Sequence, residues 1–258
     1  MTKFIKIFHL VYVYFVKFTL LRIFKNFSKN RKYVESLFSK FKVVGERFIP
    51  VANYYFLKNF NFKDDEVIAS FGIGSDIDFE IAMFNNFNSK SYIYDPTPRS
   101  KEFMSEFKGR EEFIYRDKGL AVTNGKKSFY QIRPWSDYTI NKPKIYFDNI
   151  EVEFINLNQV FKEISEKVIV LKLDIEGAAL DIMLELFLSK KFENLKFIIV
   201  EFESPFFEKK DKFHEFKQKI EKLIKILEIS NFEYLRIPKD KKKEKFVTLE
   251  LFIDLRNK

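Results

Sequence analysis

The chain has 258 residues, enough for one domain with additions, and its 46% hydrophobic and 18% aromatic content can fill a large core. It contains no cysteine, so disulfides, thiolate metal sites and a cysteine nucleophile are excluded. Its only histidines, His9 and His214, lie far apart in the sequence, which argues against a histidine-rich metal site or a Ser-His-Asp triad.

The net charge of +9 is concentrated in residues 1–32, which carry eight lysines and arginines and no acidic residue. The rest of the chain is nearly neutral, with 38 basic against 37 acidic residues. A nucleic-acid-binding protein more often has a basic stripe across its folded body, so we expect no nucleic-acid partner.

Residues 1–32 are predicted to form a basic, aromatic-rich helical arm. Their apolar run Ile7–Val16 is shorter than the roughly 20 residues of a membrane span. Lysine and arginine mixed with aromatic residues suit peripheral contact with a membrane, and packing on the domain is the equal alternative. We therefore expect a cytoplasmic protein, either free or held at the inner face of the membrane.

Residues 33–65 are predicted to be a helical lead-in. A helix and then a loop are expected over Tyr33–Val51, with Gly45 and Pro50 as the breaking residues. A short helical or irregular segment is expected over Asn53–Asp65. No residue in this range carries a chemical signature, so the chemistry is expected in a third unit, residues 66–258.

That unit opens with a predicted strand, Glu66–Phe71, a glycine turn, Gly72-Ile73-Gly74-Ser75-Asp76, and a helix from about Asp78. Glycine lets the backbone approach a ligand closely, and a helix N-terminus offers free N–H groups. The third glycine of a dinucleotide-binding G-x-G-x-x-G motif is missing. The turn is therefore either a ligand cradle or an ordinary strand-to-helix turn.

Asp95 ends the next predicted strand, Ser91–Tyr94, about 20 residues after the glycine turn. An acid at this spacing accepts hydrogen bonds from ribose hydroxyls in nucleotide-binding α/β folds. A third strand, Glu112–Arg116, leads into Asp117, Gly119 and Leu120. An adenine ring would fit there, and a simple entry into a hairpin is the alternative.

The stretch Val168–Glu185 carries the strongest signal. An apolar run, typical of a buried parallel strand, ends at Asp174 and Glu176, and a helical pattern follows Gly177. Ligands of open α/β sheets bind beyond the carboxyl ends of the strands. The acids therefore either belong to a site or merely meet the next helix N-terminus, where negative charge is favoured. The following strand, Lys196–Phe202, is expected to lie beside this one and has Glu201 and Glu203 at its end.

These motifs together resemble a known family. Their order and spacing are similar to those of FkbM-type S-adenosylmethionine-dependent methyltransferases, and the resemblance covers about residues 66–254. It rests on four segments: Phe71-Gly-Ile-Gly-Ser-Asp76, Tyr94-Asp-Pro-Thr-Pro98, Gly119-Leu-Ala121 and Leu171-Lys-Leu-Asp-Ile-Glu-Gly-Ala178.

The resemblance implies a class I Rossmann-like methyltransferase fold, an α/β fold whose mostly parallel sheet has a terminal antiparallel strand. It also implies S-adenosylmethionine as the cofactor and methyl transfer to a hydroxyl. Carried over by motif, the glycine turn would hold the methionine part of the cofactor, Asp95 the ribose and Asp117 to Leu120 the adenine. Asp174 and Glu176 would face the methyl group and the acceptor.

Two departures from the family pattern stand out. Ala179 occupies the place of the last acid in the family's DIEGAE motif, and Glu203 stands where related sequences often read EFH. Because no suitable histidine is present, the base must be a carboxylate. We assign that role to Asp174 or Glu176, with Glu201 orienting the acceptor, and we expect no resident metal. A divalent cation held by these carboxylates is the alternative.

The resemblance implies O-methylation of a sugar or surface glycan as the reaction. An insertion over residues 133–155 would lie above the strand ends, where Trp135 and Tyr138 either stack on a sugar face or pack a loop. The alternative function is a non-catalytic nucleotide-fold binding module, tethered by its arm to a membrane assembly.

Overall fold

A computed structural model describes residues 41–131, 138–140, 142, 146–175, 177–190, 192, 194–203, 210–230, 232–237 and 248–256, with Lys32, Tyr33 and Ser36. Apart from Lys32, the predicted arm over residues 1–32 lies outside this description, as do Glu176 and Trp135. None of the helices within the described ranges is both long and apolar enough to cross a bilayer.

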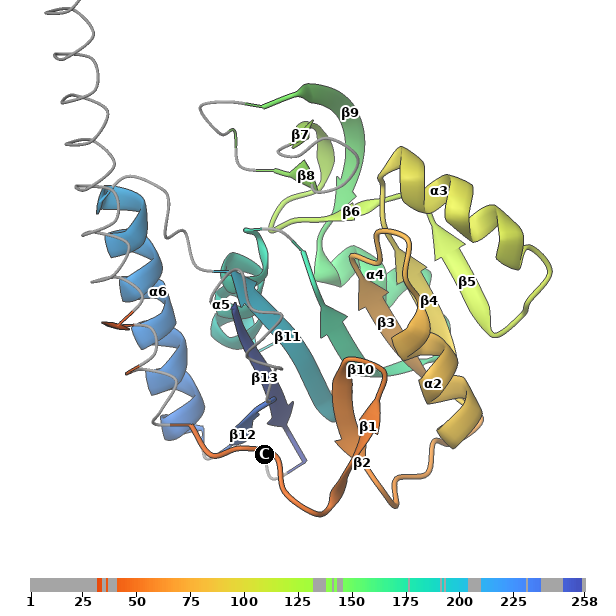
Figure 1. Ribbon diagram of the computed structural model, residues 1–258, viewed down its shortest axis with the longest axis horizontal. Coiled ribbons are helices and arrows are strands. Elements are labelled where there is room, and N and C mark those ends of the chain that lie inside the picture. The colour runs from red at the N-terminus through yellow and green to blue at the C-terminus, as the bar shows by residue number, and fades with distance from the viewer. Residues whose placement is uncertain are drawn as a thin grey trace, which may run out of the picture.

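The described chain alternates strands and helices over most of its length (Figure 1). Its elements are β1 Phe48–Val51, β2 Tyr54–Leu57, β3 Glu66–Phe71, α2 Asp78–Phe87, β4 Lys90–Tyr94, α3 Pro98–Met104, the 3-10 helix η1 Ser105–Phe107, β5 Phe113–Arg116, β6 Gly119–Leu120, β7 Gly125–Gln131, β8 Tyr138–Thr139, β9 Asp148–Ile155, α4 Leu157–Glu163, β10 Lys167–Leu173, α5 Ala179–Ser189, β11 Phe197–Glu203, α6 Lys210–Ile229, β12 Glu233–Arg236 and β13 Thr248–Asp254.

A seven-stranded sheet in the order β12-β13-β11-β10-β3-β4-β5 forms the centre of the molecule. The pairs formed by β10 with β11 and β3, and by β4 with β3 and β5, are parallel. β13 is antiparallel to both β11 and β12. This arrangement confirms the predicted fold class. The strand order reverses between β3 and β10, which is the switch point at which open α/β sheets bind ligands.

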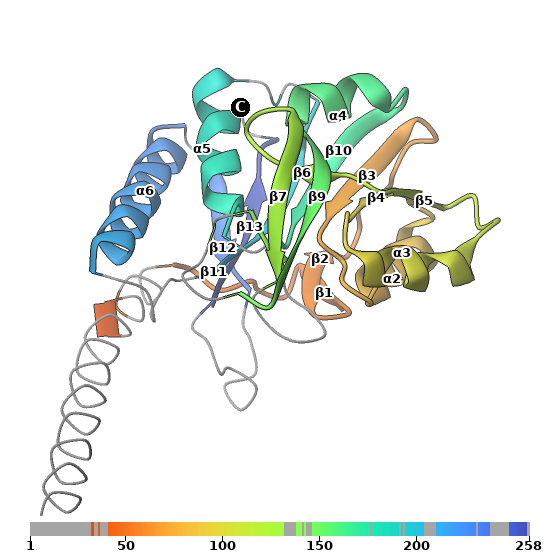
Figure 2. The same ribbon diagram turned by 90° about the horizontal axis from the view of Figure 1, so that it is seen from above.

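The two faces of the sheet have separate cores. On one face, buried side chains of the sheet pack with those of α4, α5 and α6. On the other face, β10, β11 and β13 are covered by the β1–β2 hairpin, and β3 packs against α2. Figure 2 shows α4 and α5 on one side of the sheet, and the hairpin, α2 and α3 on the other.

The hairpin is a correction to the predicted helical lead-in over residues 33–65. β1 and β2 pair antiparallel through a two-residue turn, with Val51 opposite Tyr54. Phe56 is fully buried and lies with its ring centroid 5.2 Å from that of Phe197 on the sheet. The segment forms strands because alternate residues can bury aromatic and aliphatic side chains against the sheet. Local sequence preference alone does not reveal that surface.

A second, four-stranded sheet has the order β6-β9-β7-β8. It is inserted between β5 and α4, and it stands beyond the carboxyl ends of the central strands (Figure 1). Its own small core contains Ala121, Val152 and Phe154, with Phe129, Ile140 and Ile150 packed around them. The predicted insertion is therefore a folded sheet in its described part.

Candidate functional site

A pocket of about 430 Å³ opens at the switch point between β3 and β10. This volume lies within the range of small-molecule sites. The wall on the main sheet comes from the loops that follow β3, β4 and β10, and the opposite wall comes from the small sheet. The lining residues are Phe71–Gly74, Tyr94–Arg99, Gly119, Leu120, Phe129, Gln131, Tyr138, Ile140, Phe154, Asp174, Ile175 and Ala178.

The glycine turn after β3 is shaped by its contact with β10. Gly72 has φ +78° and Gly74 has φ +57°, both in the left-handed region. A Cβ atom on Gly72 would stand 1.8 Å from the backbone oxygen of Asp174. Only glycine lets these two chain segments touch, and this contact places the turn beside Asp174.

Asp95 joins the glycine turn to the proline turn after β4. Its buried carboxylate accepts from the N–H groups of Ile73 and Gly74 through Oδ2, both at 3.0 Å. Its Oδ1 accepts from the N–H and the hydroxyl of Thr97, at 2.9 and 2.7 Å. Four donors fill the roughly four acceptor positions of a carboxylate. A ribose hydroxyl can therefore bind Asp95 only by replacing one of them.

Further side chains lock these turns from behind. The Ser100 hydroxyl lies 2.5 Å from the carbonyl oxygen of Gly74, and Thr97 caps α3 by accepting from the N–H of Ser100 at 3.3 Å. Tyr115 donates to the carbonyl of Asp95. Burial, with the nearby charges of Asp117 and Asp95, raises the pKa of Tyr115, so that it remains a donor.

Asp174 is held at both its backbone and its side chain. Its N–H donates to the carbonyl of Phe71 at 3.0 Å. Its carboxylate accepts a 2.8 Å hydrogen bond from the Tyr54 hydroxyl of the hairpin. The predicted catalytic acid thus lines the pocket in a fixed place.

A buried ion pair lies beside Asp174 and Tyr54, at a place that we call the acidic corner of the pocket. The Nζ atom of Lys172 is 3.6 Å from Oε1 of Glu80 on α2, and both side chains are almost wholly inaccessible. The Ser70 hydroxyl also binds Glu80. Burial lowers the pKa of Lys172, but the charges of Glu80, Asp174 and Asp76 outweigh it and raise that pKa above the ordinary value. Lys172 is therefore a fixed positive charge.

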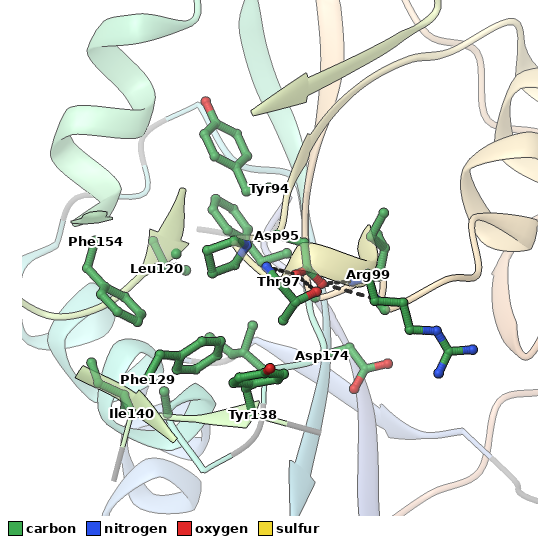
Figure 3. Close-up of a pocket in the computed structure, with 18 of the residues that line it drawn as sticks. Tyr94, Asp95, Thr97, Arg99, Leu120, Phe129, Tyr138, Ile140, Phe154 and Asp174 are labelled. Carbon is green, nitrogen blue, oxygen red and sulfur yellow. Dashed lines mark hydrogen bonds between the residues drawn. The ribbon is translucent and has the colours of Figure 1, made fainter. Parts of the chain in front are cut away.

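The small sheet gives the pocket an apolar wall. Phe129 and Tyr138 are stacked with centroids 5.3 Å apart, and the Phe154 ring packs edge-on against Phe129. In Figure 3, Phe129, Tyr138 and Ile140 lie together along one side, with Asp174 between them and Arg99. We call Phe129, Tyr138 and Ile140 the aromatic wall.

The structure brings together six of the predicted site residues around this pocket. They are Gly72, Gly74, Asp95, Gly119, Leu120 and Asp174. Four others do not line it, and Glu176 lies outside the described residues. These four are Ser75, Asp76, Asp117 and Glu201.

Three of these four have well-defined positions elsewhere. Asp76 is exposed and accepts from the N–H of Asp78 at 2.8 Å. Asp117 pairs with Lys101, with 2.6 Å between Oδ2 and Nζ. Glu201 is half-buried on β11, one residue beyond the registered pair Leu173–Val200. Continued alternation would put it beside Asp174 on the hairpin face.

Sequence reasoning missed Tyr54, Lys172, Glu80 and Phe129. One signal was available for Lys172, because a single lysine within the apolar strand Val168–Leu173 needs a buried partner. No local signal marks Tyr54. Among the described residues, no group of three or more His, Asp or Glu side chains is placed to hold a metal ion.

Comparison with known proteins gives a family and several distant structures. The Methyltransferase FkbM domain matches residues 28–234. The crystal structure of methyltransferase FkbM from Methylobacillus flagellatus KT is 11% identical with a TM-score of 0.48, covering 83% of this chain and 49% of that one. This chain thus spans about half the length of that protein.

Two other solved structures are similar at a lower TM-score. An rRNA methylase from Streptococcus thermophilus is 10% identical with a TM-score of 0.41, covering 74% of this chain and 87% of that one. The N-terminal domain of human METTL16, in complex with SAH, is 11% identical with a TM-score of 0.39, covering 75% and 64%. A comparison with curated proteins gave no match.

Proposed function

Because this chain belongs to the FkbM methyltransferase family, we propose that it transfers a methyl group from S-adenosylmethionine to a hydroxyl of a sugar or surface glycan. The family match, over residues 28–234, confirms the predicted family and the cofactor that it uses. The observation that carries the proposal is the position of Asp174. Its carboxylate lines the same pocket as the glycine turn and Asp95.

The pocket residues fit this cofactor. Gly74 has open space where a Cβ atom would stand, so its backbone is accessible. Leu120 and Phe154 supply apolar surface suited to the adenine ring, and Asp95 is the acid nearest to the expected ribose. The cofactor supplies a methyl group on a positively charged sulfur, which leaves as a neutral thioether.

The protein's task is to align the acceptor oxygen with that methyl group. The O–C bond forms as the C–S bond breaks, and the acceptor hydroxyl loses its proton. Asp174 accepts this proton as the oxygen attacks, because a carboxylate beside the oxygen stabilises the developing positive charge. The fixed position of Asp174 supports this role.

The aromatic wall supports a ring-shaped acceptor with an apolar face. Aromatic side chains line small-molecule pockets with large, rigid contact area, and a few polar groups fix the orientation. Gln131 lies on the same sheet and lines the pocket as such a polar group. A sugar has both properties, since its C–H face can lie on Tyr138 while its hydroxyls point towards Asp174.

The test is methyl transfer from labelled S-adenosylmethionine into the glycans of cells that lack this protein, followed by mass spectrometry of the product. Asp174→Asn is expected to lower turnover at least about a hundredfold, the scale of general-base catalysis, while cofactor affinity stays within a few-fold. The matched control is Asp64→Asn, which removes an exposed carboxylate on a loop outside the pocket. Full turnover in Asp174→Asn would remove Asp174 from the role.

No observation in the described part of the chain favours the alternative of a membrane-tethered binding module, and we do not propose it. A divalent cation is tested in the same assay. Turnover that survives exhaustive chelation rules out a required metal.

A further inference from the structure

We propose that the β1–β2 hairpin is part of the active site, and that Tyr54 is a positioning residue that fixes the carboxylate of Asp174. The inference rests on the proposed function, in which Asp174 acts on the acceptor hydroxyl. It adds a residue 120 positions away in the sequence, from an element outside the main sheet.

The contact is partly buried, at the edge of the pocket. Tyr54 is only 6% exposed, and its hydroxyl lies 2.8 Å from Oδ2 of Asp174. A hydrogen bond to a charged acceptor in such a place is stronger than one at the surface. It holds Oδ2 in place and thereby sets the orientation of the whole carboxylate in the pocket.

The ring of Tyr54 is held from two sides, so the hydroxyl has little freedom. The ring of Phe79 on α2 meets it edge-on, with centroids 5.3 Å apart. The ammonium of Lys172 lies 5.4 Å from the centroid of the Tyr54 ring. That ammonium is itself fixed by its ion pair with Glu80. The buried pair thus supports the tyrosine as well as the strand.

The hairpin is in turn anchored on the sheet. Val51 and Phe56 are fully buried. The ring of Phe48 lies edge-on to that of Phe252, with centroids 4.9 Å apart. Strand alternation explains the meeting, since Lys172 and Asp174 both project to the face that the hairpin covers. Tyr54 reaches Asp174 because β2 lies over the end of β10.

Other charged groups lie around Asp174 and remain in any variant of Tyr54. They are Lys172 on β10, Glu80 on α2, Asp76 in the glycine turn, Asp95 on the loop after β4, Arg99 at the start of α3 and, by strand alternation, Glu201 on β11. A change of titration in a Tyr54 variant therefore reports the hydroxyl alone.

The experiment compares Tyr54→Phe with Tyr55→Phe in the full chain. Tyr55 is the next residue of the same strand and does not line the pocket, so its variant is a matched loss of one hydroxyl. The carboxyl carbon of Asp174 is followed by NMR against pH, its signal identified by its loss in Asp174→Asn. In Tyr54→Phe, the titration midpoint should rise by about one pH unit, because the charged form loses a hydrogen bond.

A turnover measurement gives the second readout. Once the labelling assay has identified the acceptor, Tyr54→Phe should lower kcat about tenfold and leave cofactor affinity unchanged. Thermal melting checks that both variants fold. If Tyr54→Phe does not fold, the NMR signal of the Tyr54 phenol carbon is compared between the wild type and Asp174→Asn. This signal should shift in Asp174→Asn, because the carboxylate that accepts the hydrogen bond of Tyr54 is gone.

An unchanged Asp174 titration in Tyr54→Phe, or an unmoved Tyr54 signal in Asp174→Asn, overturns the inference and leaves the proposed function standing. Full turnover in Asp174→Asn would instead show that Asp174 is not the base. The proposed function of Asp174 would then be wrong, and Tyr54 would have no positioning role. The NMR titration requires neither cofactor nor acceptor, so the two failures are told apart.

Discussion

Gly72 is the residue at which the turn after β3 touches the backbone after β10. A side chain there would have to occupy the place of the Asp174 carbonyl, which belongs to rigid backbone. Gly72→Ala should therefore lower the free energy of unfolding by about 3 kcal/mol or more, from backbone strain and overpacking together. Urea denaturation measures the change.

Gly74→Ala is the control for that substitution. Gly74 also has a positive φ, but nothing lies within 4 Å of the place that a Cβ atom would take there. Its replacement should cost only the backbone strain, about 1 kcal/mol. Equal costs at the two positions would show that the contact with Asp174 does not decide the need for glycine at Gly72.

At the residue scale, the sequence predicts contacts between the ends of neighbouring parallel strands, and it misses contacts between the sheet and an element packed on it. Gly72, Asp95 and Asp174 each directly follow a strand, and their nearness follows from a parallel sheet. Tyr54 and Asp174 meet only because a hairpin lies over β10. The family motifs do not include the hairpin, so the residues alone could not predict that pair.

Glu166 joins β4 to the start of β10 at the amino-terminal end of the strands, opposite the pocket. Its carboxylate binds Nζ of Lys90 at 2.7 Å and the hydroxyl of Tyr92 at 2.8 Å. The hydrogen bond from Lys90, which outweighs the effect of burial, lowers the pKa of Glu166 from 4.5 to about 2. The folded state thus prefers the charged form more strongly than the unfolded chain does.

A pKa that is lower in the folded state contributes stability above the ordinary pKa and loses it as the pH falls. Glu166→Gln should therefore lower the free energy of unfolding by about 2 kcal/mol at pH 7, allowing for partial exposure of the pair. The gap to wild type should shrink between pH 4.5 and about 2. Urea denaturation across this range measures it, with the exposed Glu46→Gln as control. A gap independent of pH would contradict the ion pair.

At the element scale, the hairpin was missed for identifiable reasons. Pro50 lies inside β1, and proline argues against a strand unless the strand is at an edge. The turn consists of Ala52 and Asn53, and Ala52 takes φ +53°, where a hairpin turn normally has glycine. By contrast, β10 and α5 were predicted well, because an unbroken apolar run marks the strand and an apolar helical pattern marks the helix.

At the scale of the whole molecule, the fold and an insertion above the strand ends were predictable, and the strand pairing that makes this insertion a wall of the pocket was not. The alternation of strands and helices, with a final hairpin and the family resemblance, predicts a mostly parallel sheet with a terminal antiparallel strand, as observed. The small sheet is different, because its strands are short and partly exposed. Its residues Phe129 and Phe154 line the pocket because β7 pairs with β9, and this pairing has no local signal in the sequence. Its aromatic wall faces the acidic corner that the main sheet provides.

This arrangement predicts that the pocket is divided between two ligands. The turns of the main sheet, with Leu120 and Phe154, hold the cofactor, and Phe129, Tyr138 and Ile140 contact the acceptor. Tyr138→Ala should then raise the KM for the acceptor about five- to tenfold through the lost ring contact, with cofactor affinity within twofold. Tyr146→Ala is the matched control, because Tyr146 comes from the same insertion, is 38% exposed and does not line the pocket. A loss of cofactor affinity in Tyr138→Ala, with the acceptor KM unchanged, would instead assign the aromatic wall to the cofactor.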